Sequence, residues 1–163
     1  MAREKRTSEQ LQAASDPLHY ELWMFQKTAE ALATGICGEG VLHNALLESF
    51  VIHARNLLDF LYPKKNLWPD DVIAGDFFDD PKSWISERPS KSEKIASLHN
   101  RAGKEVAHLT YARLDVTPET KPWQFVEIAN EVVSVFDKFL AIVPLDRLGD
   151  RWSELKSQRM QAD

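Results

Sequence analysis

The sequence predicts an all-α protein, an antiparallel bundle of four to five helices with a long loop between the second and third helices. Apolar residues recur at helical spacing in four segments, 17–34, 41–62, 92–113 and 122–143, and no segment shows the alternation typical of a strand. The chain has 163 residues, 44% of them hydrophobic, so one domain can bury a sizeable core. Amphipathic helices bury their apolar stripes against one another, which favours a bundle.

The first predicted helix begins at Asp16, a favourable N-cap residue, with Pro17 at the first helical position. Gly35 ends it, because glycine is the residue that most often follows a helix. Its apolar stripe is Leu18, Leu22, Phe25, Ala29 and Leu32. Residues 1–15 are charged and polar, so we expect a flexible N-terminal arm there and assign the bundle to residues 16–144.

The second predicted helix, 41–62, is the longest, and Pro63 ends it. Its buried stripe is predicted to be Leu47, Phe50, Ala54, Leu57, Leu58 and Leu61. Arg55 and Asp59 lie four residues apart on the far side of the helix, where opposite charges typically form a solvated pair.

A long, proline-punctuated loop, 64–89, follows the second helix. Its four large aromatic residues predict that it packs against the bundle: Trp68, Phe77, Phe78 and Trp84. It also carries five aspartates, Asp70, Asp71, Asp76, Asp79 and Asp80. Their spacing lacks the ordered ligand pattern of a calcium loop, so we assign no metal and no cofactor.

The third helix, 92–113, is predicted to face inward with Ile95, Leu98, Ala102, Val106 and Leu109. The fourth begins at Pro122, ends before Pro144, and buries Phe125, Ile128, Val132, Val135, Phe139 and Ile142. Residues 145–163 are expected to form a C-terminal tail with a short helix around Trp152.

Charge and composition limit the function classes. The net charge of −5 gives no global basic field, so contact with nucleic acid requires a local patch or a dimer groove. Cys37 is the single cysteine, which excludes an internal disulfide and suits a reducing compartment. The polar N-terminus does not have the pattern of a secretory signal, and no apolar stretch approaches the length of a membrane span. We therefore expect a cytoplasmic protein.

Arg101 and His108 are the pair of residues that most suggests chemistry. Seven residues on a helix are two turns, so the two side chains differ by only about 20° in direction. An arginine can hold a phosphate, and a histidine can move a proton. Glu105 lies between them, at the edge of the predicted buried face.

These residues resemble the HEPN superfamily, whose helical bundles carry an arginine followed by four to six residues and a histidine. Here six residues separate Arg101 from His108. The stretch Lys104-Glu105-Val106-Ala107-His108 is similar to the K-x-x-A-H ending of abortive-infection relatives. The stretch His53-Ala54-Arg55-Asn56-Leu57-Leu58-Asp59-Phe60-Leu61 is similar to their first core helix. The resemblance covers roughly residues 40–143.

The resemblance implies a metal-independent endoribonuclease of a toxin–antitoxin or phage-defence type. In that chemistry a ribose 2′-OH attacks the neighbouring phosphate and leaves a 2′,3′-cyclic end. The family pattern implies that Arg101 stabilises the developing charge and that His108 transfers the proton, with Asn56 or His53 orienting the histidine. The resemblance also implies a homodimer, with RNA as the substrate or an antitoxin protein as the partner.

Two other interpretations remain open from the sequence. The chain is alternatively a catalytically silent helical module for protein interaction or dimerisation, in which Arg101 is a surface charge. A more remote alternative is a bundle metalloprotein, because Glu105 and His108 form a Glu-x-x-His motif. Di-iron bundles need two such motifs and two further glutamates, and this chain has one copy.

Overall fold

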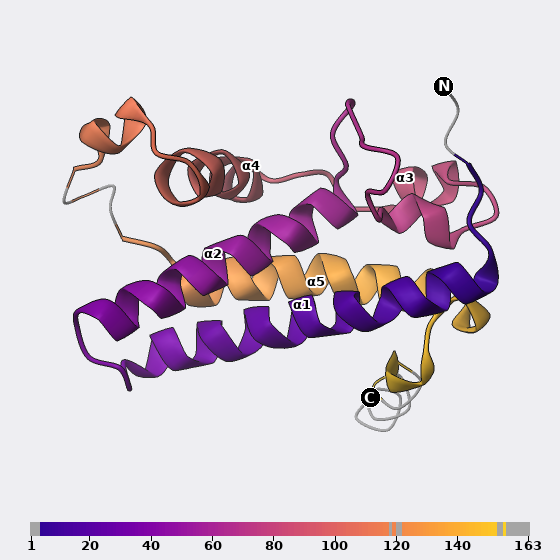
Figure 1. Cartoon of the computed structure of the whole chain (residues 1–163), viewed down its shortest axis with the longest axis horizontal. Helices are drawn as coiled ribbons and strands as arrows, with labels where there is room; N and C mark the ends of the chain where they lie inside the picture. Colours follow the sequence, from indigo (N-terminus) through magenta and orange to yellow (C-terminus); the bar gives the residue numbers. More distant parts are fainter. Residues whose placement is uncertain (1–3, 118, 120–121, 153–154, 156–163) are drawn as a thin grey trace.

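The computed structural model describes residues 4–117, 119, 122–152 and 155, and in this part of the chain it is all-α without strands. Four main helices pack together: α1 (Ser8–Thr34), α2 (Val41–Leu61), α4 (Glu93–Arg101) and α5 (Phe125–Ile142). Helices α1, α2 and α5 run lengthwise in Figure 1, whereas α4 is seen nearly end-on and so crosses the other three. None of the described helices is long and apolar enough to span a membrane.

Helix α1 begins at Ser8, well before the predicted start at Asp16. Thr7 caps it: the Thr7 hydroxyl accepts from Gln10 N–H, and the Gln10 side chain accepts from Thr7 N–H. Residues 8–15 are therefore helix and not the flexible arm predicted from the sequence. Pro17 lies inside the helix. The capping box and the burial of the added turns offset the hydrogen bond that this proline removes.

The α1–α2 hairpin agrees with the sequence prediction. Gly35 closes α1 with a φ of 64°, a left-handed conformation that favours glycine. Helix α2 ends at Leu61, one residue from its predicted end. Both predicted stripes are buried except for Leu47, which is half-buried. The two helices meet through the stacked rings of Phe25 and Phe50, 5.0 Å apart.

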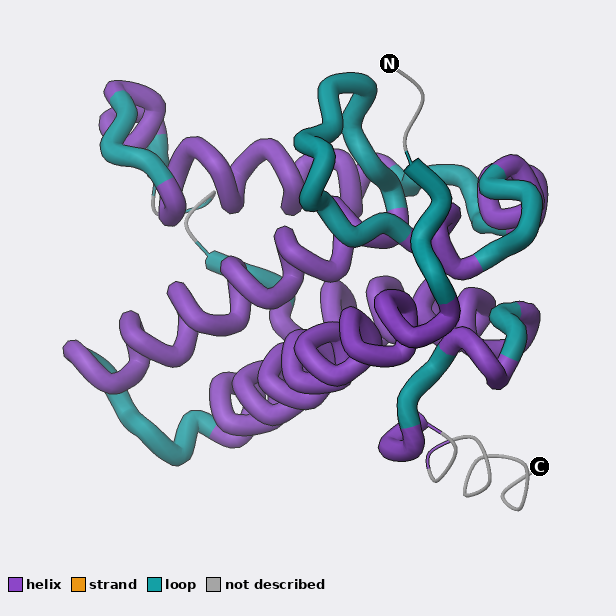
Figure 2. The backbone as a smooth tube through the Cα atoms, turned by 45° about the vertical axis from the view of Figure 1, so that its right-hand side comes forward, coloured by secondary structure: helices purple, strands orange, loops and turns teal. Residues whose placement is uncertain are grey.

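The loop after α2 folds onto the bundle and contains two short helices, the 3-10 helix η1 (Ala74–Phe77) and α3 (Lys82–Glu87). Three of its four aromatic residues are buried, as predicted, and Trp84 Nε1 donates to Leu61 O at 2.8 Å. Trp68 is the exception, because 74% of it is exposed. In Figure 2 this loop is the long teal segment that follows α2.

The prediction of a continuous third helix over 92–113 is wrong beyond residue 107. Helix α4 continues from Arg101 as the π-helix η2 (Ala102–Ala107) and then stops. Its last hydrogen bond runs from His108 N–H to Gly103 O, and the Thr110 hydroxyl donates a hydrogen bond to Lys104 O. A separate 3-10 helix, η3 (Tyr111–Asp115), follows. Leu109, predicted to face inward, is 92% exposed.

Helix α5 begins at Phe125, later than the predicted Pro122, and buries most of its predicted stripe. The 3-10 helix η4 (Leu145–Arg147) follows it, and a helical stretch begins at Asp150. Trp152 in this stretch is fully buried, so residues 145–152 pack onto the bundle, whereas the sequence predicts a tail there. The predicted tail residues 153–154 and 156–163 lie outside the described part of the chain.

Candidate functional site

Arg101, the arginine of the predicted catalytic pair, is half-buried and already makes several contacts within the protein. Its Nε donates to Glu105 Oε1 at 2.8 Å and its Nη2 to Glu105 Oε2 at 2.9 Å, a bidentate ion pair. Its guanidinium lies 4.0 Å from the centre of the Trp123 ring, and its Nη1 donates to Pro122 O at 3.5 Å. The charge that would stabilise a phosphate is thus neutralised by Glu105.

His108 is exposed and lies just outside the helical segment, with an extended backbone (φ −125°, ψ 145°). The side chains of Arg101 and His108 point in a similar direction only if one continuous α-helix carries both residues. The chain between them winds as a π-helix, with more residues per turn, and the α-helical argument therefore fails. The catalytic pairing of Arg101 with His108 therefore stays a prediction from the family resemblance.

His53 and Asn56, the predicted orienting residues, both contact Glu21 of α1. His53 Nδ1 lies 2.7 Å from Glu21 Oε2, and Asn56 Nδ2 donates to the same oxygen at 3.0 Å. These two polar side chains therefore join α2 to α1. Sequence analysis missed Glu21, because its only signal is its position beside these residues in the folded hairpin.

Substitutions of Arg101 and of His108 are expected to change the stability of the protein by different amounts. We expect Arg101→Ala to lower the free energy of unfolding by about 1–2 kcal/mol, since it leaves the Glu105 carboxylate, only 20% exposed, without its ion pair. His108→Ala is expected to change it by less than about 0.5 kcal/mol, as for an exposed residue. Urea denaturation of both variants at pH 7 measures the difference. Equal stability of the two variants would contradict a structural role for Arg101.

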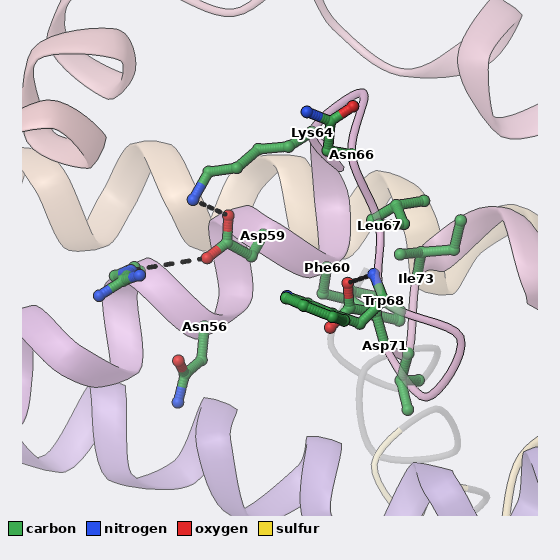
Figure 3. Close-up of a pocket in the computed structure, with 11 residues that line it drawn as sticks. Asn56, Asp59, Phe60, Lys64, Asn66, Leu67, Trp68, Asp71 and Ile73 are labelled. Carbon is green, nitrogen blue, oxygen red and sulfur yellow. Dashed lines mark hydrogen bonds and ion pairs between the residues drawn. The ribbon is translucent and has the colours of Figure 1, made fainter. Parts of the chain in front are cut away.

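A different group of side chains gathers around Asp59 on α2, and we call Arg55, Asp59, Lys64 and His99 the Asp59 cluster. Asp59 Oδ1 lies 2.9 Å from His99 Nε2 and 3.3 Å from Lys64 Nζ, while Asp59 Oδ2 lies 3.6 Å from Arg55 Nε. Figure 3 shows Lys64 reaching back from the loop to Asp59. The sequence predicted the Arg55–Asp59 pair, but not that α4 and the loop add two further basic groups.

The cluster keeps Asp59 ionised. Burial acts to raise the pKa of this carboxyl, but the hydrogen bond and charge of His99 and the charge of Lys64 outweigh it, and the pKa lies below its usual value. The charges of Asp59 and Lys64 also act on the nearby Lys91. Burial lowers the pKa of Lys91 most, Asp59 raises it, and the charges of Arg88 and Lys64 lower it further. Asp59 therefore lies within a group of basic side chains.

A cavity of about 340 Å³ opens beside the Asp59 cluster, between α2 and the following loop. Its lining residues are Arg55, Asn56, Asp59, Phe60, Lys64, Asn66, Leu67, Trp68, Asp71, Val72 and Ile73. The Asp71 carboxylate, the second acid of this cavity, accepts from the Trp68 backbone N–H at 2.7 Å. Two cations and an exposed indole thus face one small space, of a size that ligand pockets reach.

The basic surface continues past the end of α2. Arg88 and Lys91 each place their charge 5.1 Å from the centre of the Tyr62 ring, and Arg88 Nη1 also donates to Leu61 O at 3.1 Å. Burial raises the pKa of the Tyr62 hydroxyl, which donates to Pro89 O and stays neutral. Local positive charge therefore exists in a protein whose net charge is −5.

The described residues contain no group of three or more His, Cys, Asp or Glu side chains arranged to hold a metal ion. In the Glu-x-x-His motif, Glu105 is already bound by Arg101. Neither that motif nor the aspartates of the loop give an observation from which a metal site can be argued.

No known protein family, no curated protein and no solved structure matches this chain. The relation to the HEPN superfamily thus stays a hypothesis from the sequence motifs.

Proposed function

We propose that this chain is a HEPN-like helical domain that acts on RNA, and that the Asp59 cluster holds an RNA phosphate. The observation that carries the proposal is the gathering of Arg55, Lys64 and His99 around one carboxylate at the wall of a cavity. Guanidinium and ammonium groups are the protein's phosphate ligands, and they dominate affinity for nucleic acid.

Arg55 is better placed than Arg101 to bind an anion. Its ion pair with Asp59 is a single contact from Nε at 3.6 Å, and a guanidinium can bind two phosphate oxygens through its other N–H groups. In Arg101, by contrast, Nε and Nη2 both donate to Glu105, and the guanidinium lies over the Trp123 ring. The Arg55 and Arg101 side chains are similarly exposed, at 27% and 24%, so the longer ion pair of Arg55 is what favours it.

Cleavage is the finer part of the proposal, and it comes from the family resemblance. The reaction transfers a proton from the attacking 2′-OH and supplies one to the departing 5′ oxygen. Histidine is the side chain best suited to such transfers. His99, paired with Asp59 at 2.9 Å, is the histidine of this site, and we assign the role to it in place of His108.

A specific observation also favours the second candidate, a catalytically silent interaction module. Leu109, Tyr111 and Leu114 are all exposed in the segment that follows the π-helix η2. Figure 1 shows η3 standing away from the three long helices. Exposed apolar side chains gathered in one segment are typical of a protein contact, such as the dimer or the antitoxin implied by the resemblance.

The test measures binding of a fluorescein-labelled, 20-nucleotide single-stranded RNA in EDTA, by anisotropy, over a series of salt concentrations. We expect the Arg55→Gln/Lys64→Gln double variant to lose at least tenfold in affinity at low salt. The slope of log K against log salt should become shallower by about one to two, one for each lost phosphate contact. Lys138→Gln/Arg151→Gln removes the same charge from exposed positions elsewhere and is the matched control.

The outcomes separate the candidate functions. No binding by the unaltered protein, or equal losses in the site and control variants, overturns the proposal. Bound RNA that is cut to 2′,3′-cyclic ends, with cutting lost in His99→Ala, supports the nuclease. RNA that is bound and stays intact supports a silent binding domain. If cleavage is lost in His108→Ala but kept in His99→Ala, proton transfer belongs to His108, the residue predicted from the sequence.

A further inference from the structure

Two aromatic side chains on α1, Tyr20 and Trp23, are exposed side by side. Their exposed fractions are 51% and 49%, their ring centres lie 6.3 Å apart, and their planes differ by 35°. The residues are three apart, so they occupy the same face of the helix on successive turns. About half of the surface of each residue is open to solvent.

This aromatic pair is connected to the cavity of the Asp59 cluster. The Tyr20 ring meets the His53 ring edge-on, with centres 5.8 Å apart, and His53 and Asn56 both contact Glu21. Asn56 also lines the cavity, and Figure 3 shows its side chain pointing from α2 toward α1. A chain of contacts therefore links the Tyr20 ring, through His53, Glu21 and Asn56, to the wall of the cavity that Arg55 and Lys64 also line.

We propose that Tyr20 and Trp23 form a stacking platform for the bases of single-stranded RNA whose phosphate lies in the Asp59 cluster. The proposal rests on the proposed function and names its substrate class. Sites for single strands combine cations that follow the backbone with aromatic rings on which successive bases stack. Bases in a duplex are already stacked on one another, so exposed rings favour an unpaired strand.

The surroundings of the pair favour a ligand with both aromatic and charged groups over a second copy of this chain. Tyr20 contacts the ring of His53, and Glu21, the next residue in sequence, holds His53 in an ion pair or hydrogen bond. Glu21 does not face a strand as a lone charge, since His53 and Asn56 hold its carboxylate. A contact between copies would instead be expected to continue into apolar side chains.

The test compares the unaltered protein with Tyr20→Ser/Trp23→Ser. The matched control is Leu42→Ser/Leu145→Ser, which also removes two exposed apolar side chains. The probes are a 12-nucleotide oligouridylate, an RNA duplex of the same length, and inorganic polyphosphate, which has charge but no bases. Circular dichroism and thermal melts check that each variant is folded.

We expect the unaltered protein to bind the single strand at least tenfold more tightly than the duplex. The Tyr20/Trp23 variant should lose at least tenfold for oligouridylate, because each stacked base contributes about fivefold or more. Its affinity for polyphosphate and its salt slope should stay unchanged, since the cations remain. The control variant should bind all three probes as the unaltered protein does.

Unchanged binding of oligouridylate by the Tyr20/Trp23 variant overturns the platform, while sensitivity to Arg55→Gln/Lys64→Gln leaves the proposed function standing. An equal loss for polyphosphate also overturns it, because the rings would then not be acting on bases. A halved mass in light scattering with RNA affinity kept would identify the pair as a contact between copies. Failure of the unaltered protein to bind RNA overturns both proposals.

Discussion

Phe139→Ala is expected to lower the free energy of unfolding by about 3–5 kcal/mol, the typical cost of removing a buried phenyl ring. Phe139 is fully buried at the centre of the aromatic core. Five rings surround it with centres 5.1–5.9 Å away: Phe60, Phe77, Phe78, Trp84 and Phe136. These rings come from α2, the loop and α5, so the cavity left by the substitution cannot close by the movement of one element.

Urea denaturation followed by far-UV circular dichroism measures this change. Val126→Ala, an exposed position on the same helix, is the matched control and should change stability by less than about 0.5 kcal/mol. A cost below about 1 kcal/mol for Phe139→Ala would show that the loop does not pack on α5 as the structure has it.

Trp152→Ala is expected to cost a similar amount, about 3–5 kcal/mol. The Trp152 ring is fully buried, lies against the Phe136 ring at 5.7 Å and meets the His19 ring edge-on at 5.2 Å. Its Nε1 donates to Ser15 O at 2.9 Å, in a turn of α1 that the sequence had assigned to a flexible arm. The substitution removes both the buried area and this hydrogen bond.

The same denaturation experiment tests Trp152→Ala, with the neighbouring exposed Arg151→Ala as its control. A loss for Trp152 alone would show that the segment after α5 and the first turns of α1 stabilise each other. Equal, small changes in the two variants would instead support the sequence prediction, in which both segments lie outside the bundle.

The sequence by itself determined what depends on local periodicity. Most of the predicted stripe residues of α1, α2 and α5 are buried, because a helix with one apolar face has to cover it. Gly35 marks the end of α1 for the same local reason, since its backbone conformation favours glycine. The nuclease chemistry, the homodimer and the RNA substrate remain predictions.

Local signals failed where another local signal or a distant contact competed with them. Asp16 and Pro17 form a good helix start, but the capping box of Thr7 and Gln10 provides another one, and contacts with the chain near Trp152 favour the longer helix. Helix α4 was extended too far, because its apolar spacing continues to Leu109 although the π-helix ends at Ala107.

The candidate site depended almost wholly on tertiary structure. From the sequence, the i,i+4 pair of Arg55 and Asp59 was visible, because one helix carries both residues. His99 lies 40 residues from Asp59 in sequence, and no periodicity within a helix reports a contact between helices. The same reason explains why the contacts of Arg101 could not be predicted. Its charge is visible in the sequence, but the ring of Trp123 that covers it is brought there only by the packing of α4 against the start of α5.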